Sequence, residues 1–297
     1  YRNTKKNSII VFANKEKTKN LLIYDSINKI LIKNNIIAPQ LLSQNYKKNY
    51  IEIQDLGKKT IYQIFSNYKK KQYPIFKKAI NVLNKIQLVK DKKIKNFKNE
   101  FYLIKDYKNK ILLDEANLFS HWYVPKKLDK KKINIFKTKF NREIKLLLSK
   151  LHFKNDTFVH RDFHVSNLIV NSKNQIGLID NQDALIGNKA YDLASLIDDV
   201  RYKTSNSLKE KVYNYYLMTN KKINADKFKN DYDILSVLRN LKIIGIFMRL
   251  AERDKKRKYL KLIPYAWKMI DNRIGKNKDL VNLKLLLETN FPKFITK

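Results

Sequence analysis

The residues best suited to chemistry are gathered in the segment FVHRDFHVSNLIV, residues 158–170. A His-Arg-Asp triplet ends at Asp162, and Asn167 follows after four intervening residues. A second carboxylate, Asp180, comes directly after the apolar run GLI. Transfer of a phosphoryl group from ATP needs a carboxylate that orients the attacking hydroxyl, and oxygen ligands that hold Mg²⁺. The order Asp, Asn, Asp supplies both, so the segment predicts the loop of a Mg–ATP phosphotransferase.

A β-hairpin is predicted directly after this loop. The strand-like runs NLIVN and QIGLID flank the polar turn SKNQ. Such a hairpin brings Asn167 and Asp180 to the same end, where both can bind one cation. The spacing alone is a weak signal, because Asp and Asn in a turn more often cap the local backbone. The order of loop, hairpin, Asp180 and the following YDLASL favours the catalytic interpretation.

The elements before the loop predict a small α/β lobe. SIIVFA, residues 8–13, is typical of a short strand. Apolar residues spaced from Leu21 to Leu31 indicate a helix, and the alternating NYIEIQDLG indicates a half-buried strand that stops at Gly57. We therefore expect residues 1–57 to form an N-lobe that covers a nucleotide. The chain begins at Tyr1 rather than Met, which is consistent with an N-lobe that is truncated.

The larger remainder, residues 58–297, is predicted to be mainly helical and to carry the catalytic loop, the metal site and the substrate pocket. A short strand is expected at DTFVH, before the loop. The predicted fold class is α+β with two lobes. The expected helices cover residues 60–66, 73–89, 133–152, 208–218, 231–252 and 259–273.

Composition restricts the partners and the location. The chain has 297 residues, 43% of them hydrophobic, and no Cys, which excludes disulfides and thiolate metal sites. No run is long enough to span a membrane, so we expect a cytoplasmic protein without a membrane partner. The net charge of +37 comes from Lys residues spread along the whole chain. We interpret them as solvated surface in an A+T-rich coding sequence, and we expect no specific nucleic-acid partner.

The segments VHRDFHVSNLIV and GLIDNQDALIGNKAYDLASLIDD resemble the aminoglycoside phosphotransferase/choline kinase superfamily, whose fold is kinase-like. Within it the chain is most similar to the anomeric sugar kinases of bacterial cell-wall recycling, which phosphorylate N-acetylmuramate and N-acetylglucosamine at the C1 hydroxyl. The similarity continues through APQLLSQN, IEIQDLGKKT, LLDEANLFSHWY and LRNLKIIGIFMRLAERDKKRKYL, and so spans nearly the whole chain.

The resemblance implies ATP as the phosphoryl donor and Mg²⁺ as cofactor. It implies that Asp162 is the catalytic base and that Asn167 and Asp180 bind Mg²⁺. It gives Asp192 the role of bracing the loop and His160 a packing role within it. The adenine-contacting segment is implied to be IQDL, mostly through backbone groups of Gln54, Asp55 and Leu56.

The sequence also departs from the kinase pattern. It has no Gly-rich phosphate loop and no clear V-A-I-K lysine on the first strand. Lys15 lies just beyond that strand. The sequence therefore does not identify the cationic residue that contacts the phosphates.

Four residues are candidates for substrate binding: Asp183, Glu115, Trp122 and Arg249. Core packing is an equally good account of Trp122. A surface salt bridge with Glu252 or Asp254 is the stronger account of Arg249. A choline- or aminoglycoside-type kinase stays open, because these acidic and aromatic residues also suit a cationic substrate. A basic nucleic-acid-binding scaffold with an inactive kinase fold is the non-enzyme alternative. The sequence does not indicate an oligomeric state.

Overall fold

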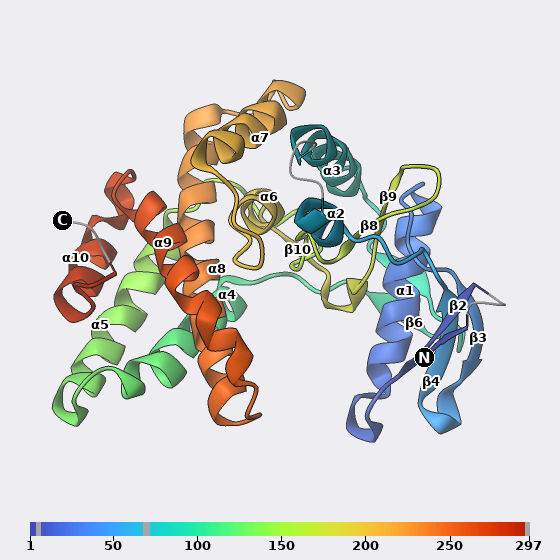
Figure 1. Cartoon of the computed structure of the whole chain (residues 1–297), viewed down its shortest axis with the longest axis horizontal. Coiled ribbons are helices and arrows are strands. Elements are labelled where there is room, and N and C mark those ends of the chain that lie inside the picture. The colour runs from blue at the N-terminus through green and yellow to red at the C-terminus, as the bar shows by residue number, and fades with distance from the viewer. Residues whose placement is uncertain (4–6, 68–71, 295–297) are drawn as a thin grey trace. The chain divides into compact units, whose positions relative to one another are not determined.

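The computed structural model describes residues 1–3, 7–67 and 72–294 (Figure 1). Its contacts divide the chain into two compact units, each described by itself below. The first unit comprises Tyr1–Asp106, Asp156–Leu196 and Glu210–Tyr216. The second comprises Tyr107–Asn155, Ile197–Lys209 and Leu217–Lys297. The lobe boundary expected after Gly57 stays a prediction.

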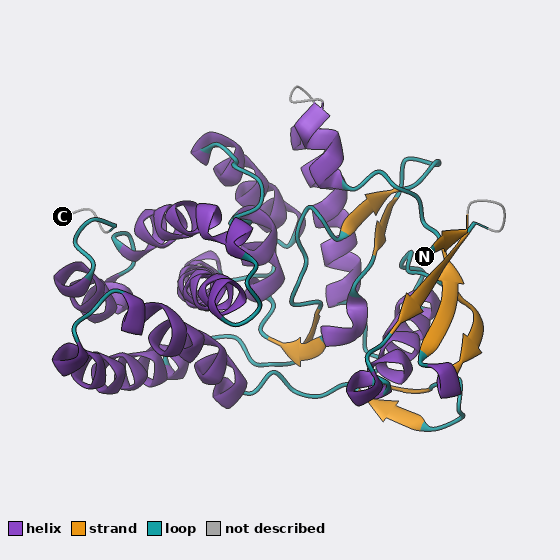
Figure 2. Ribbon diagram, turned by 60° about the horizontal axis from the view of Figure 1, so that its bottom comes forward, coloured by secondary structure: helices purple, strands orange, loops and turns teal. Residues whose placement is uncertain are grey.

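An antiparallel sheet opens the first unit, in the strand order β1-β2-β4-β3. The strands are β1 (Arg2–Asn3), β2 (Ser8–Phe12), β3 (Leu41–Asn45) and β4 (Tyr50–Gln54). Helix α1 (Lys19–Lys33) packs against this sheet (Figure 2). Leu21 of the helix and Ile51 and Ile53 of β4 form a buried cluster between them. The two strands and the helix predicted in this part are confirmed.

The rest of the first unit positions the candidate loop. The predicted hairpin is present, because β8 (Leu168–Val170) pairs antiparallel with β9 (Ile176–Leu178). Strand β7 (Thr157–Val159) pairs with β10 (Leu185–Gly187). The other elements are α2 (Ile61–Asn67), α3 (Gln72–Gln87), the hairpin of β5 (Lys93–Lys95) and β6 (Phe101–Leu103), and α6 (Ala190–Ile197).

The second unit is helical (Figure 1). Its longest helix, α8, is buried along most of its length and contacts α4 and α9. Gly245 of α8 is needed at the α4 contact, since a Cβ there would lie 2.3 Å from the main chain of Leu118. The helices are α4 (Asn109–Leu118), α5 (Lys130–Ser149), α8 (Ala225–Glu252), α9 (Ile263–Ile274) and α10 (Val281–Asn290). Helix α7 (Asn206–Thr219) contributes to both units.

Short helical turns complete the chain. The segment Phe119–Tyr123 is a π-helical turn after α4. The 3₁₀ turns are η1 (Lys15–Lys17), η2 (Tyr46–Lys48), η5 (Val124–Lys126), η6 (Asn181–Asp183), η7 (Arg257–Leu262) and η8 (Lys278–Leu280).

A cluster of aromatic rings forms the core of the second unit. Phe119 is fully buried and stacks on Tyr123 with ring centroids 5.2 Å apart. The rings of Trp267 and Phe291 meet Phe119 edge to face, each at 5.6 Å. Such pairs add about 0.5–1.5 kcal/mol each beyond the burial of their area. Phe119 is therefore a core residue.

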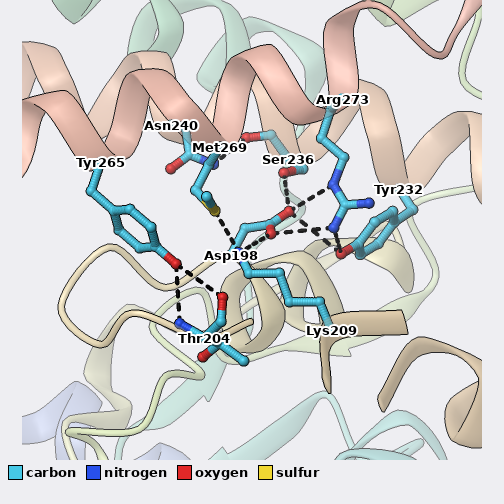
Figure 3. A network of polar contacts seen from close by, with 9 residues as sticks. All are labelled: Asp198, Thr204, Lys209, Tyr232, Ser236, Asn240, Tyr265, Met269 and Arg273. Atoms are coloured by element: carbon cyan, nitrogen blue, oxygen red, sulfur yellow. Dashed lines mark hydrogen bonds and ion pairs between the residues drawn. The ribbon is translucent and has the colours of Figure 1, made fainter. Parts of the chain in front are cut away.

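A buried ion cluster joins α7, α8 and α9 within the second unit (Figure 3). The carboxylate of Asp198 accepts hydrogen bonds from Lys209 Nζ at 2.8 Å and Arg273 Nε at 3.0 Å. The hydroxyl of Ser236 donates to it at 2.7 Å, and that of Tyr232 accepts from Arg273 Nη2. Burial opposes ionisation of Asp198, but the two cations outweigh it and hold the pKa of this carboxyl well below its usual range.

The predicted α+β class is confirmed, with a strand-rich N-terminal part and a larger helical remainder. All six predicted helices are present, although α8 begins at Ala225 rather than Asp231. Helices α4, α6 and α10 and the β5–β6 hairpin were not predicted. Within the described ranges, no helix is both long and apolar enough to cross a bilayer.

Candidate active site

The backbone of the loop is fixed by the buried carboxylate of Asp192, at the start of α6. It accepts the main-chain N–H of His160 at 2.6 Å and that of Arg161 at 3.0 Å. Arg161 has a φ of 71°, a left-handed conformation that costs a non-glycine residue energy and needs such support. Burial raises the pKa of Asp192 to about 6, although His160 and the two amides oppose that rise. The bracing role expected of Asp192 has the contacts that it requires.

Asn167 is oriented by the loop itself. Its Nδ2 donates to the carbonyl of Asp162 at 3.1 Å, and its main-chain N–H donates to the carbonyl of His164 at 2.9 Å. The side-chain nitrogen is thus used inside the loop, which leaves Oδ1 as the group available to a cation. The main-chain N–H of Ile179 donates to the carbonyl of Asn167 at 3.1 Å, which joins the end of β9 to the loop.

Asp180 follows β9 in a left-handed conformation, with φ 63° and ψ 43°. Asp and Asn tolerate this region better than most residues. Its Oδ1 accepts a hydrogen bond from Gln182 Nε2 at 2.9 Å. Asp180 and Asn167 border the same cavity, of about 780 Å³, within the first unit. One carboxylate and one amide oxygen are hard donors that fit Mg²⁺, which usually takes its remaining ligands from phosphates and water.

The cavity has an apolar part and a polar part. Its apolar lining includes Val11 of β2, Ile53 of β4, Ile169 of β8, and Leu56 and Ile179, which follow β4 and β9. Its polar lining includes Lys17, Asn20, Tyr24 and Lys58, besides Asn167 and Asp180. Lys15, which lies just beyond the first predicted strand, is not among the lining residues, whereas Lys17 is. A cavity lined by apolar side chains, lysines and oxygen donors can hold a flat ring and a chain of phosphates.

The segment expected to contact adenine, Gln54 to Leu56, borders this cavity. The N–H of Gln54 donates to the carbonyl of Gln40, and that of Asp55 donates to the carbonyl of Asn7, both at 2.8 Å. The N–H of Leu56 has no partner among the described residues, so it is the donor that this segment offers to a ligand.

The turn after this segment is held by an ion pair. Arg2 Nε lies 2.5 Å from Asp55 Oδ2, and Asp55 Oδ1 accepts the N–H of Gly57 at 2.8 Å. Gly57 has a φ of 112°, which a residue with a side chain rarely adopts. The glycine and the ion pair therefore fix the exit of β4 beside the cavity.

His160 packs inside the loop, as expected. Its imidazole is fully buried, and its Nε2 contacts both the carbonyl of Ile179 and the side chain of Asn181. Of the four substrate candidates, only Asp183 shares the unit of Asp162. Asp183 is exposed, and its main-chain carbonyl accepts from Arg161 Nη1 at 3.1 Å.

Glu115 and Trp122 lie in the second unit. Glu115 accepts a hydrogen bond from the Tyr107 hydroxyl and pairs with Lys242 at 2.9 Å. Its carboxylate is therefore already engaged. Trp122 is half-buried in the π-helical turn after α4.

Arg249 also lies in the second unit, and the surface salt bridge expected for it is absent among the described residues. The nearby Arg253 pairs with Asp254 at 2.7 Å, and Glu252 pairs with Lys126. In the described part of the chain, the buried Nε of Arg249 has no hydrogen-bond partner. The same holds for Nη1 of Arg239, a buried residue of α8 that the sequence did not single out. The scarcity of Arg in a Lys-rich chain is a signal that could have found this position.

Comparison with known proteins identifies the class. Residues 31–225 match the model of the phosphotransferase enzyme family. The N-acetylmuramate/N-acetylglucosamine kinase of Pseudomonas putida is 26% identical over 268 residues, which cover 88% of this chain and 76% of that protein.

Solved structures share the fold. A choline/ethanolamine kinase family protein from Mesorhizobium loti superposes with a TM-score of 0.63 at 11% identity, covering 95% of this chain and 87% of that one. An aminoglycoside phosphotransferase from Streptomyces rimosus, in complex with ADP and streptomycin, gives a TM-score of 0.53 at 11% identity, with 79% and 89% covered.

The chain belongs to the phosphotransferase enzyme family. It has the kinase-like fold expected from the sequence, and it is an enzyme that phosphorylates a hydroxyl group. This removes the alternative of a scaffold with an inactive kinase fold.

Proposed function

We propose that this enzyme transfers the γ-phosphoryl group of ATP to the anomeric hydroxyl of an N-acetyl amino sugar. The observation that carries the transfer chemistry is the placement of Asn167 and Asp180 on one cavity beside the Asp162 loop. The choice of sugar is supported by the similarity to an N-acetylmuramate/N-acetylglucosamine kinase along most of the chain.

The nucleotide takes the cavity of the first unit. Its adenine ring lies against the apolar lining, and the N–H of Leu56 donates to the ring edge. Carbonyl groups of Gln54 and Asp55 complete this backbone contact. Lys17 and Lys58, which border the cavity, meet the phosphates. Asn167 Oδ1 and the Asp180 carboxylate would hold Mg²⁺, which would supply positive charge to the phosphates.

In the reaction the C1 hydroxyl oxygen of the sugar attacks the γ-phosphorus. The bond between that phosphorus and the oxygen bridging to the β-phosphate breaks, and ADP leaves. The Asp162 carboxylate orients the hydroxyl and accepts its proton, as general bases in this position do. Asp192 keeps the loop in place through its two hydrogen bonds, and it takes no part in proton transfer.

Asp183, Glu115, Trp122 and Arg249 stay the candidates for binding the sugar. Only Asp183 belongs to the unit of Asp162, and it is proposed to accept a hydrogen bond from a sugar hydroxyl. Arg249, whose buried Nε has no hydrogen-bond partner in the described part of the chain, is proposed to pair with the lactyl carboxylate of N-acetylmuramate. Because Lys242 already engages Glu115, an acidic cage for a cation is less well supported. This favours the amino sugar over choline or an aminoglycoside.

The test is product analysis. The protein is incubated with ATP and Mg²⁺ and with N-acetylmuramate, N-acetylglucosamine, choline or an aminoglycoside, and the products are identified by ³¹P NMR. We expect a sugar 1-phosphate. A sugar 6-phosphate, or turnover only with choline or an aminoglycoside, would overturn the proposal. Arg249→Ala should reduce turnover of N-acetylmuramate more than that of N-acetylglucosamine, and equal loss on both sugars would remove the carboxylate contact alone.

A further inference from the structure

A buried polar side chain in α1 has no place in the roles described so far. Asn28 lies in the middle of the helix and is only 3% exposed. Asn is a poor residue for a helix interior, because its amide competes with the backbone for hydrogen bonds. A buried amide there also needs a partner to repay its desolvation. The partner of its oxygen lies outside the helix, because Asn28 Oδ1 accepts a hydrogen bond from Asn181 Nδ2 at 2.7 Å.

Asn181 continues the contact to the catalytic loop. It directly follows Asp180 and is 0% exposed. Its Oδ1 lies 2.8 Å from Nε2 of His160, and its Nδ2 also donates to the carbonyl of Leu178 at 3.3 Å. The other ring nitrogen of His160, Nδ1, accepts the main-chain N–H of Asp162 at 3.2 Å. An unbroken series of hydrogen bonds therefore connects α1 with the backbone of Asp162.

Backbone groups fix the direction of every bond in this series. The Asp162 amide can only donate, so Nδ1 of His160 must carry a lone pair. If the imidazole is neutral, its proton is then on Nε2, which donates to Asn181 Oδ1. The carbonyl of Leu178 can only accept, which independently places the nitrogen of Asn181 on that side. The Asp162 amide and the Leu178 carbonyl therefore lead to the same assignment. His160 is protonated on Nε2, and Asn181 points its oxygen toward His160 and its nitrogen toward Asn28.

The far end of the series borders the nucleotide cavity. Tyr24 lies one helical turn before Asn28 and lines that cavity. Burial raises the pKa of Tyr24 to about 12, while a hydrogen bond from Asn28 opposes the rise. The hydroxyl of Tyr24 is therefore neutral at physiological pH, and it can contact a nucleotide and Asn28 at the same time.

We propose that Asn28 and Asn181 are positioning residues for phosphoryl transfer. They hold His160 as the Nε2–H tautomer. The Nδ1 atom of His160 then accepts the main-chain N–H of Asp162, which fixes the position of this residue relative to α1 and Asp180. The inference rests on the role proposed for Asp162. Helix α1 carries none of the proposed catalytic or metal-binding groups. According to this inference, it nevertheless helps to keep the catalytic loop ordered.

Kinetics test the positioning role. Asn28→Leu and Asn181→Leu keep the side-chain size but remove the hydrogen bonds. We expect each to lower kcat about tenfold, as the loss of one buried hydrogen bond does, with KM for ATP and sugar changed less than about threefold. The double variant should be no slower than the slower single variant, because both break one series. Asn28→Asp keeps the acceptor oxygen for Asn181 and should recover most of kcat.

Asn96→Leu is the matched control. Asn96 is a buried amide of the same unit, 5% exposed, and its Oδ1 accepts the N–H groups of Lys98 and Glu100 away from the loop. This variant should lose thermal stability and keep its kcat. If Asn28→Leu and Asn181→Leu also keep wild-type kcat, the positioning role is wrong.

Two NMR readings do not depend on turnover. In ¹⁵N-histidine-labelled wild-type protein, His160 is assigned by the resonance lost in His160→Gln, since the chain has only four His residues. We expect protonated Nε2 and unprotonated Nδ1 at neutral pH, and a proton on Nδ1 would overturn the inference. The Asp162 amide should exchange faster with solvent in Asn28→Leu than in Asn96→Leu, and equal exchange would also overturn it. If no acceptor is phosphorylated, the proposed function fails, while these readings still decide the inference.

Discussion

The side-chain nitrogen of Asn167 lies 3.1 Å from the main-chain carbonyl oxygen of Asp162 and donates a hydrogen bond to it. This contact connects Asp162 and Asn167, the two residues that the sequence separates by four others. It gives Asn167 a fixed orientation, with its oxygen available to a cation, and it holds the backbone of Asp162 at the same time. Metal binding and orientation of the acceptor hydroxyl are therefore expected to depend on each other.

Replacing Asp162 by Ala should lower kcat by about 10²–10⁴-fold, because removal of a general base has effects of this size. The main-chain bonds of residue 162 do not use the side chain, so the fold should persist. Steady-state kinetics and circular dichroism measure both. Asp156→Ala, an exposed carboxylate of the same unit, is the control and should keep its rate. A near wild-type rate for Asp162→Ala would remove this residue from the mechanism.

Activity should require Mg²⁺ or Mn²⁺, and Asp180→Asn should raise the metal concentration needed at least about tenfold. Asn tolerates the left-handed conformation of residue 180, so the change removes charge with little strain. Titration of the metal at saturating ATP measures the shift, with Asp91→Asn as a control on the same unit. Turnover that persists in excess chelator would contradict the metal assignment.

Much of this site could be predicted from the sequence, because its parts are adjacent in the chain. The loop, the hairpin and Asp180 lie within one stretch, and the polar turn SKNQ fixes how the strands meet. The Asn28–Asn181 contact could not be predicted, since it depends on how α1 packs against a turn that lies far away in sequence. Lys17 was missed for a similar reason, as one lysine among many carries no signal until the cavity is formed.

In the fold, strong periodicity predicted the long helices. The first turns of α8, from Ala225, were missed, although Asn224 caps that helix by accepting the N–H of Lys227. The short helices α4, α6 and α10 offer too few turns for a clear apolar period. Their positions are set by tertiary packing.

The pH dependence should reflect Asp192. Its folded-state pKa, about 6, lies above the ordinary value of an Asp. Between those two values the folded protein binds more protons than the unfolded chain, so the free energy of unfolding should fall as pH rises through this window. Asp192→Asn should remove that slope in urea titrations at several pH values. It should also slow turnover near pH 7, because only the ionised carboxylate offers acceptors to both amides.

Asp198→Ala should destabilise the second unit by about 3–5 kcal/mol, because it leaves Lys209 and Arg273 buried without their counter-ion. The lowered pKa of Asp198 means that its contribution is present above the ordinary Asp pKa and is lost as pH falls through the lower folded value. Urea unfolding followed by tryptophan fluorescence measures both effects. Asp254→Ala, which breaks the exposed pair with Arg253, is the control and should leave the midpoint unchanged.

The net charge of +37 should give only weak binding to nucleic acid, without sequence preference and strongly reduced by salt. Fluorescence anisotropy with two unrelated duplexes, at low and at physiological salt, measures this. Tight binding to one sequence at physiological salt would show that the lysines form a specific surface.

The division of the chain into interleaved segments has a consequence for its synthesis. The helix pair α4–α5 leaves the ribosome before the catalytic loop does, yet the helix that it packs against, α8, follows that loop. The contact of Leu118 with Gly245 and the ion pair of Glu115 with Lys242 therefore form only after α8 has been synthesised. By then the segments of the first unit that include the catalytic loop have already been made. In the interval before α8 is made, the apolar face of α4 that packs against α8 is not covered by its native partner. Nascent chains that stall between residues 155 and 225 should therefore recruit chaperones more strongly than either shorter or full-length chains.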